Sequence, residues 1–193
     1  MARSVGVTRE RVVAVAAELA DEVGLQELTL AQVATQLGVK IPSLYNHVDG
    51  LPGLQRELAM LGIRELGERL RDAAVGKAHD DAVLAMGQAY RAYVLEHPGR
   101  YAASVRAPHP EDRELQQLSS WVVGVVVTVL RPYELGEEGT IHAVRGLRSV
   151  AHGFATLERA GGFGMPLERD TSFLLLMRTF IAGLHAWREP EEC

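Results

Sequence analysis

The polar side chains between residues 40 and 47 have the chemistry needed to contact a nucleic acid. Lys40 and Ser43 can donate hydrogen bonds to base edges, and Ile41 can contact a thymine methyl group. Tyr45 and His47 suit phosphate oxygens, because phosphate and sugar accept half or more of the hydrogen bonds in protein–DNA interfaces. The outward-facing set that we predict consists of Lys40, Ile41, Ser43, Tyr45, Asn46 and His47.

Two short helices joined by a tight turn, over residues 29–47, are predicted to position these side chains. Thr29 can cap the first helix, and Gln32, three residues later, completes a capping box. Gly38 follows the helix end, where a left-handed conformation costs little for glycine. Pro42 fits the first turn of the second helix, where its missing N–H is not needed. This is the layout of a helix-turn-helix DNA reader, and an ordinary helical hairpin is the alternative.

The charge balance argues against a general binder of polyanions. The net charge is −5, and residues 1–50 hold four basic against six acidic residues. DNA binding therefore requires the basic residues to gather on one side, and we expect Arg3, Arg9 and Arg11 to join Lys40 there. Thr29, at the start of the first motif helix, is a further DNA-contacting candidate because helix N-termini supply N–H groups to phosphates.

The remaining periodicity predicts an all-α chain of about nine helices, with no convincing strand. The valines between residues 122 and 129 favour a strand, but the helical start of that segment and the lack of a partner strand favour a helix. Outside the motif, we expect helices over residues 8–23, 49–74, 80–96, 99–105, 110–130, 137–160 and 170–187.

Composition excludes several classes of protein. Cys193 is the only cysteine, so no disulfide can form within one chain, and no apolar run reaches the ~20 residues of a membrane span. We expect a cytoplasmic protein with no membrane contact. The seven histidines form no spaced cluster with cysteine or acids, and no nucleophile–base set stands out. We therefore expect no metal, no cofactor and no catalytic residue.

The last predicted helix is apolar on almost every side, which predicts burial on two sides. One side can meet its own core and the other a second subunit, so we predict a homodimer. Small residues on the preceding helix would allow close approach of two backbones. A central helix of a monomer is the alternative. The residues that we assign to the interface are Gly146, Ser149, Gly153, Phe173, Met177, Ile181 and Leu184.

Aromatic and polar residues in the middle of the chain are candidates for a small-molecule pocket. An apolar helical cage with a few convergent polar groups is the usual form of such a site. The alternative is that the aromatic side chains are plain core and that the polar ones pair within the protein. The candidates are Tyr90, Tyr93, Tyr101, Trp121, Arg148 and His152.

The chain resembles the tetracycline-repressor (TetR) family of bacterial transcriptional regulators over nearly its full length. The resemblance is carried by the Leu-Gly-Val turn at residues 37–39, by Pro-Ser-Leu-Tyr-Asn-His-Val at 42–48, and by the segments at 150–154 and 157–163. It implies a helix-turn-helix domain over residues 1–50 and a helical effector-binding and dimerisation domain over 51–193. The residues that match DNA-facing family positions are Ile41, Pro42, Ser43, Tyr45 and His47.

The resemblance also implies a function. We expect a homodimeric repressor that binds a palindromic double-stranded DNA operator and is released by a small-molecule effector. The family often has a lysine near the start of the fourth helix, where this sequence has Leu51-Pro52-Gly53. Fewer phosphate contacts would give a shallower salt dependence. A helical interaction module and an enzyme on a helical scaffold are the rival functions.

Overall fold

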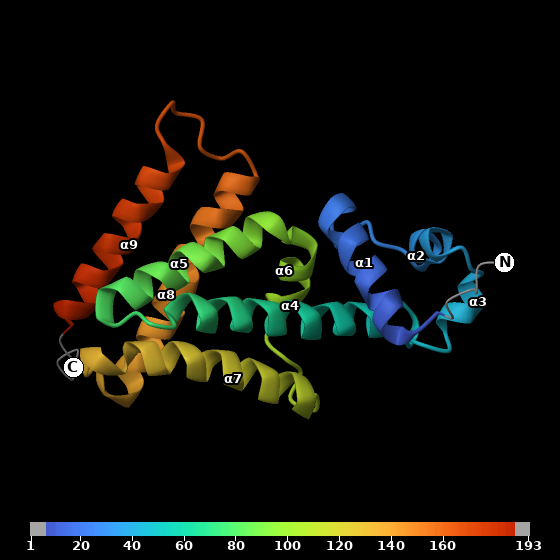
Figure 1. The fold of residues 1–193 in the computed structure, drawn as a ribbon, viewed down its shortest axis with the longest axis horizontal. Helices are drawn as coiled ribbons and strands as arrows, with labels where there is room; N and C mark the ends of the chain where they lie inside the picture. The colour runs from blue at the N-terminus through green and yellow to red at the C-terminus, as the bar shows by residue number, and fades with distance from the viewer. Residues whose placement is uncertain (1–6, 188–193) are drawn as a thin grey trace. The chain divides into compact units, whose positions relative to one another are not determined.

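A computed structural model describes residues 7–187 of the chain, which leaves Arg3 and Cys193 outside the described residues. Every regular element in this part of the chain is a helix, so the predicted all-α fold is confirmed (Figure 1). The Val-rich segment is helical, as expected, and a 3₁₀ turn, η1 (Arg131–Tyr133), follows it.

The helices form two compact units. The first contains the chain through Ile63 together with Glu96–Leu115, and the second contains Arg64–Leu95 and the chain from Gln116 onward. The compact units therefore do not divide at residue 50, where the sequence placed a boundary. Helix α4 (Gly50–Ala74) begins in the first unit and continues without a break into the second.

The first unit is built on α1 (Arg9–Val23), α2 (Leu30–Leu37), α3 (Ile41–Leu44), the start of α4, and α6 (Pro98–Ser104). Its core is apolar and continuous, because one face of each helix is lined by small or aliphatic residues at helical spacing. Helix α1 packs against both α2 and α6. The fully buried members of this core include Val12, Ala16, Ala20, Leu28, Val33, Leu44, Leu54 and Leu58.

The second unit contains α5 (His79–Glu96) to residue 95, most of α7 (Arg113–Leu130), α8 (Gly136–Arg159) and α9 (Arg169–His185). Helices α8 and α9 pack against each other. Helix starts outside the motif lie within one residue of expectation, except that of α7, which differs by three. Helix α7 begins at Arg113 and not at Pro110, because the Asp112 carboxylate accepts a hydrogen bond from Leu115 N (3.1 Å) and caps it. Asp170 lies in the first turn of α9, where it pairs with Arg91 (2.8 Å) and does not act as the cap.

Within residues 7–187, no single helix is long and apolar enough to cross a membrane. Helices α7 and α8 would be long and apolar enough only together, and the chain bends by 118° between them.

Candidate nucleic-acid interface

The helix-turn-helix motif forms as its local sequence predicts. Thr29 Oγ1 accepts a hydrogen bond from Gln32 N (3.3 Å), and Thr29 N donates to Gln32 Oε1 (2.7 Å), so both halves of the capping box are present. Gly38 ends α2 with φ 68° and ψ 30°, in the left-handed conformation that favours glycine. Pro42 stands in the first turn of α3, where it displaces no helical hydrogen bond.

Helix α3 is a single helical turn that a buried side chain holds to the core. Leu44 is completely buried, and its carbonyl oxygen accepts from both His47 N (2.9 Å) and Val48 N (3.0 Å). Val48 is also buried in the core of the first unit. These two anchors fix which side of the stretch faces inward, so the exposed side chains lie on its other side.

The predicted DNA-facing residues lie on the outer side of this stretch. Lys40, Ile41, Pro42, Tyr45 and Asn46 are exposed, with Tyr45 at 59% the most exposed of the large apolar or aromatic ones in the motif. Ser43 and His47 are half-buried at its edges, and Thr29 is exposed beside the start of α2. Of the eight candidates of the motif, six are thus exposed and two are half-buried.

The two arginines of α1 differ in their surroundings. Arg11 is exposed, whereas the guanidinium of Arg9 forms an ion pair with Glu57 on α4. The Glu57 carboxylate raises the pKa of Arg9. Hydrogen bonds at the start of α1 are the main cause that lowers the pKa of Glu10. The charge of His47 adds a small lowering effect, because the first turn of α1 lies near the residues that follow α3. Sequence reasoning placed Arg9 toward DNA but missed its acidic partner.

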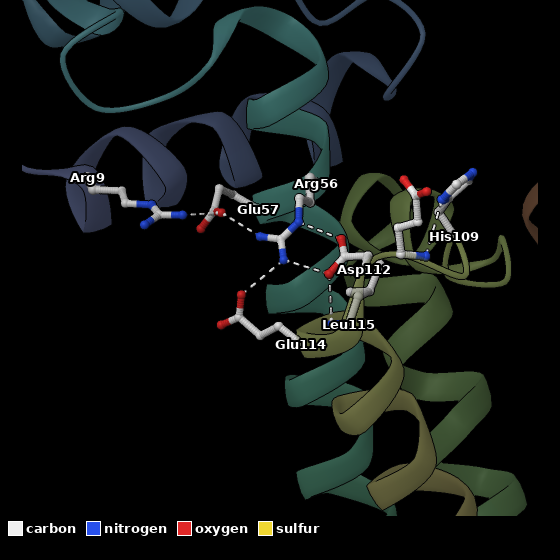
Figure 2. A network of polar contacts seen from close by, with 8 residues as sticks. Arg9, Arg56, Glu57, His109, Asp112, Glu114 and Leu115 are labelled. Carbon is white, nitrogen blue, oxygen red and sulfur yellow. Dashed lines mark hydrogen bonds and ion pairs between the residues drawn. The ribbon is translucent and has the colours of Figure 1, made fainter.

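The residues that sequence reasoning missed are mostly charged side chains paired over long stretches of chain. Asp21 on α1 accepts from Gly99 N (2.8 Å) and Arg100 N (3.0 Å) and thereby caps α6. Arg56 on α4 binds Asp112 through two parallel hydrogen bonds of 2.6 and 2.7 Å (Figure 2). These partners are 56 to 79 residues apart, so no local sequence pattern indicates the pairing.

The predicted subunit interface must be corrected in part. Phe173, Met177, Ile181 and Leu184 are buried in the core of their own chain, and a Cβ on Gly87 of α5 would meet the Met177 side chain at 2.5 Å. Gly146 faces α9 of the same chain, since a Cβ there would lie 2.9 Å from Phe180. The large apolar residues of α9 that remain exposed are Leu175 and Leu176. The side of α9 that the sequence analysis assigns to the interface is therefore the side buried in the chain's own core.

Two of the assigned small residues do face outward. Ser149 on α8 is exposed, and a Cβ on Gly153, one turn later, would meet nothing within 4 Å. On α9, the position of Gly183 is equally open. Close approach of another backbone is sterically possible at these positions.

The predicted pocket residues are not all in one unit. Tyr90 and Tyr93 are buried on α5, and Tyr93 donates a hydrogen bond to Glu65 Oε2 (3.0 Å). Trp121 lies on α7 with its ring against Gly67 of α4. Arg148 and His152 lie on α8 in the same second unit, whereas Tyr101 is buried in the first unit. A site within the second unit would thus draw on five of the six candidates.

The fold and the motif define an all-helical DNA-binding protein of the helix-turn-helix class. Residues 83–180 match the sequence model described as the tetracyclin repressor-like C-terminal domain. The chain is 35% identical over 185 residues to the uncharacterized HTH-type transcriptional regulator YobS of Bacillus subtilis (strain 168), a match that covers 95% of this chain and 96% of the relative. It is 37% identical over 185 residues to the uncharacterized HTH-type transcriptional regulator Rv0681 of Mycobacterium tuberculosis, covering 95% and 84%.

Among solved structures, a TetR variant from Acinetobacter baumannii AYE, in complex with minocycline, superimposes with a TM-score of 0.73. That match covers 94% of this chain and 98% of the other at 19% sequence identity, so it supports the fold. The chain belongs to the TetR family. It is therefore a DNA-binding transcriptional regulator of the ligand-responsive kind.

Proposed function

We propose that the chain is a homodimeric repressor that reads a palindromic operator through α3 and is released by a small molecule. The observation that carries the DNA-binding part is the division of the motif. Leu44 and Val48 hold it to the core, while Lys40, Ile41 and Tyr45 project outward from a single turn. In the major groove, the exposed side chains of such an element reach base edges and the flanking phosphates.

Specific roles follow from exposure and chemistry. Lys40, exposed at the start of α3, is proposed to bind a base edge, and Ile41 is proposed to contact a thymine methyl group. Tyr45 and His47 are proposed phosphate ligands, as are Arg11 and the N-terminal end of α2 at Thr29. Ser43, Pro42 and Asn46 complete the contact surface.

Two copies are needed because a single motif has little positive charge with which to hold DNA. We propose that the copies pair through the outer faces of α8 and α9, around Ser149, Gly153, Leu175 and Leu176. The support is that these positions combine open small residues with exposed leucines on neighbouring helices. A twofold pair would present its two α3 elements to half-sites about 34–36 Å apart, which is one turn of B-DNA.

The effector site is proposed to lie within the second unit, among Tyr90, Tyr93, Trp121, Arg148 and His152. The TetR variant solved with minocycline supports a small-molecule site in a protein of this fold. An effector changes DNA affinity only as far as it prefers one of two conformations of the dimer. A regulator that binds bacterial chromosomal DNA acts in the cytoplasm, and we propose that location and no catalytic role.

Selection of bound duplexes from random-sequence DNA, at low salt, tests the proposal. A palindromic consensus that also occurs near the gene would support it, and footprinting should then protect two half-sites. Recovery of no enriched sequence, together with no retarded band for any duplex, would contradict a DNA-reading function and leave a helical interaction module.

A further inference from the structure

One carboxylate oxygen on α4 is shared between two arginines. Glu57 Oε1 accepts a hydrogen bond from Arg9 of α1 and lies 3.4 Å from Arg56 Nη1 (Figure 2). Glu57 is largely buried, with 18% of its side chain exposed, whereas 56% of the Arg9 side chain is exposed. The carboxylate is therefore held in place, and the Arg9 guanidinium is the partner that can move away.

Two other acidic residues bind Arg56 and thereby limit its hydrogen bonding to Glu57. Its Nε and Nη2 bind both oxygens of Asp112, and Nη2 also donates to Glu114 Oε2 (2.9 Å). These hydrogen bonds are the main reason that the pKa of Arg56 is raised and that of Asp112 is lowered. Asp112 caps α7 at the same time, through Leu115 N. The contacts made at the start of α7 therefore determine how strongly the Arg56 guanidinium can bind Glu57.

Arg9 occupies an unfavourable position without an anion beside it. It is the first residue of α1, where the partial positive charge of the helix end repels a cation. In the absence of DNA, Glu57 supplies this negative charge. A DNA phosphate could supply it equally well, because guanidinium binds carboxylate and phosphate in the same geometry. The two anions compete for one side chain.

We propose that Glu57 is a positioning residue that holds Arg9 away from DNA, and that the α7 start controls this hold through Arg56. While Asp112 and Glu114 bind Arg56, its contact with Glu57 is limited to the long one at 3.4 Å, and Arg9 is the closer partner of the carboxylate. If the Asp112–Arg56 contact opens, Arg56 takes the Glu57 carboxylate and Arg9 becomes available to a phosphate. The inference rests on the proposed DNA-binding function and adds a regulated contact to it.

The test compares Glu57→Gln with Asp72→Asn. Asp72 is an exposed acid further along α4 that pairs with Arg71 at 2.8 Å, so both changes remove one negative charge per chain but only the first releases Arg9. Affinity for the duplex recovered by selection is measured as a function of salt concentration. Each phosphate contact adds about 0.9 to the magnitude of the log–log slope. E57Q should steepen the slope by about 0.9 per bound chain, and D72N should leave it unchanged.

Two further variants separate release of Arg9 from a general structural effect. Arg9→Gln should lower the affinity more strongly in the E57Q background than in the unmodified chain, by up to about fivefold per chain. Asp112→Asn, which preserves the cap of α7 because asparagine is also a good N-cap, should act in the same direction as E57Q. Weaker DNA binding in both E57Q and D112N, with an unchanged salt slope, would overturn the positioning role.

The outcomes distinguish this inference from the proposed function. If the unmodified chain binds no duplex, the DNA-binding function fails and the inference falls with it. If the unmodified chain binds DNA and E57Q behaves like D72N, the DNA-binding function stands and the control of Arg9 by Glu57 is refuted.

Discussion

Gly99 of α6 lies directly against the backbone of Ala20 in α1. A Cβ on Gly99 would be 2.1 Å from both the carbonyl carbon and the carbonyl oxygen of Ala20, which is far inside van der Waals contact. Ala20 is itself fully buried, and Asp21 beside it caps α6 through Gly99 N and Arg100 N. The approach of α6 to α1 thus depends on the absence of a single methyl group.

Replacing Gly99 by alanine should therefore destabilise the chain. The clash is with backbone, which cannot move aside as a flexible side chain does, so we expect a loss of about 1–3 kcal/mol in the free energy of unfolding. Urea denaturation followed by circular dichroism measures this. Gly124→Ala in α7 is the control, since a Cβ there meets nothing within 4 Å. It should stabilise the helix by up to about 1 kcal/mol; equal effects of the two variants would contradict the packing argument.

A buried ion pair in the second unit gives a second stability prediction. Arg91 on α5 binds both oxygens of Glu158 at 2.7 Å, and its guanidinium lies over the rings of Phe154 and Phe173. Arg91→Met would fill the same space but leave the Glu158 carboxylate, only 9% exposed, without its main partner. We expect a loss of about 3 kcal/mol, measured by denaturant unfolding.

A paired variant decides the cause of that loss. When Glu158→Leu is added to Arg91→Met, no buried charge remains, and most of the lost stability should return. If the double variant is as unstable as the single one, the ion pair contributes packing and not charge compensation. Arg71→Met, which breaks an exposed pair with Asp72, should have no measurable effect.

Local signals in the sequence predicted much of the fold and of the motif. Thr29 and Gln32, which cap the start of α2, are three residues apart, and Gly38 ends the same helix. Each effect therefore acts within one or two helical turns. The distant partners could not be predicted in this way. Nothing near Arg56 in the sequence indicates Asp112, 56 residues away, because only the packed fold brings them together.

Local sequence patterns also could not indicate which side of a uniformly apolar helix is buried. Helix α9 has leucine or phenylalanine on nearly every face, so periodicity gave no reason to prefer one. The buried side is set by Gly87 on α5, whose missing side chain leaves room for Met177. Leu175 and Leu176 then face outward. Similarly, Gly146 is small because Phe180 covers it within the same chain.

The stability of the second unit should depend on pH through Asp80 and Tyr133. Tyr133 Oη donates to Asp80 Oδ1 at 2.7 Å, and this bond, more than the neighbouring His185, lowers the pKa of Asp80. A lowered pKa stabilises the fold above the ordinary carboxyl value, and this contribution is lost as the pH falls through the lower folded value. Burial, assisted by Asp80, raises the pKa of Tyr133.

At the alkaline end the sign is the opposite. The raised pKa of Tyr133 stabilises the fold below the ordinary value of 10, and this contribution is lost as the pH rises above it. Tyr133→Phe should remove the alkaline loss and reduce the acid loss. Unfolding free energies of both proteins, measured across the pH range, check this; parallel pH profiles would show that Tyr133 and Asp80 are not coupled.

A charge on the outer face of α9 should prevent self-association without unfolding the chain. Leu176 is exposed, so Leu176→Glu leaves the core intact, but a twofold interface would place two such carboxylates close together. We expect a dimer for the unmodified chain and a monomer for the variant in sedimentation experiments. Val75→Glu, at another exposed apolar position, should remain dimeric. A dimer that survives L176E would place the interface elsewhere.

Single substitutions in the motif should separate positioning from sequence reading. Tyr45 and Lys40 are both exposed and can be changed without loss of core, unlike Leu44 between them. Tyr45→Ala removes a proposed phosphate ligand and should weaken binding to all duplexes by a similar factor. Lys40→Ala removes a proposed base contact worth about 1–3 kcal/mol, so selection should recover a consensus that is relaxed at one position in each half-site.

The salt dependence of the same variants provides an independent check. Lysine contacts to phosphate change the slope by about 0.9 each, whereas loss of a neutral tyrosine contact leaves it unchanged. If Lys40→Ala lowers the slope and keeps the consensus, Lys40 binds phosphate and the base reader lies elsewhere on α3. If neither variant changes affinity, consensus or slope, α3 does not face DNA, because an exposed turn in the major groove cannot lose these two side chains without effect.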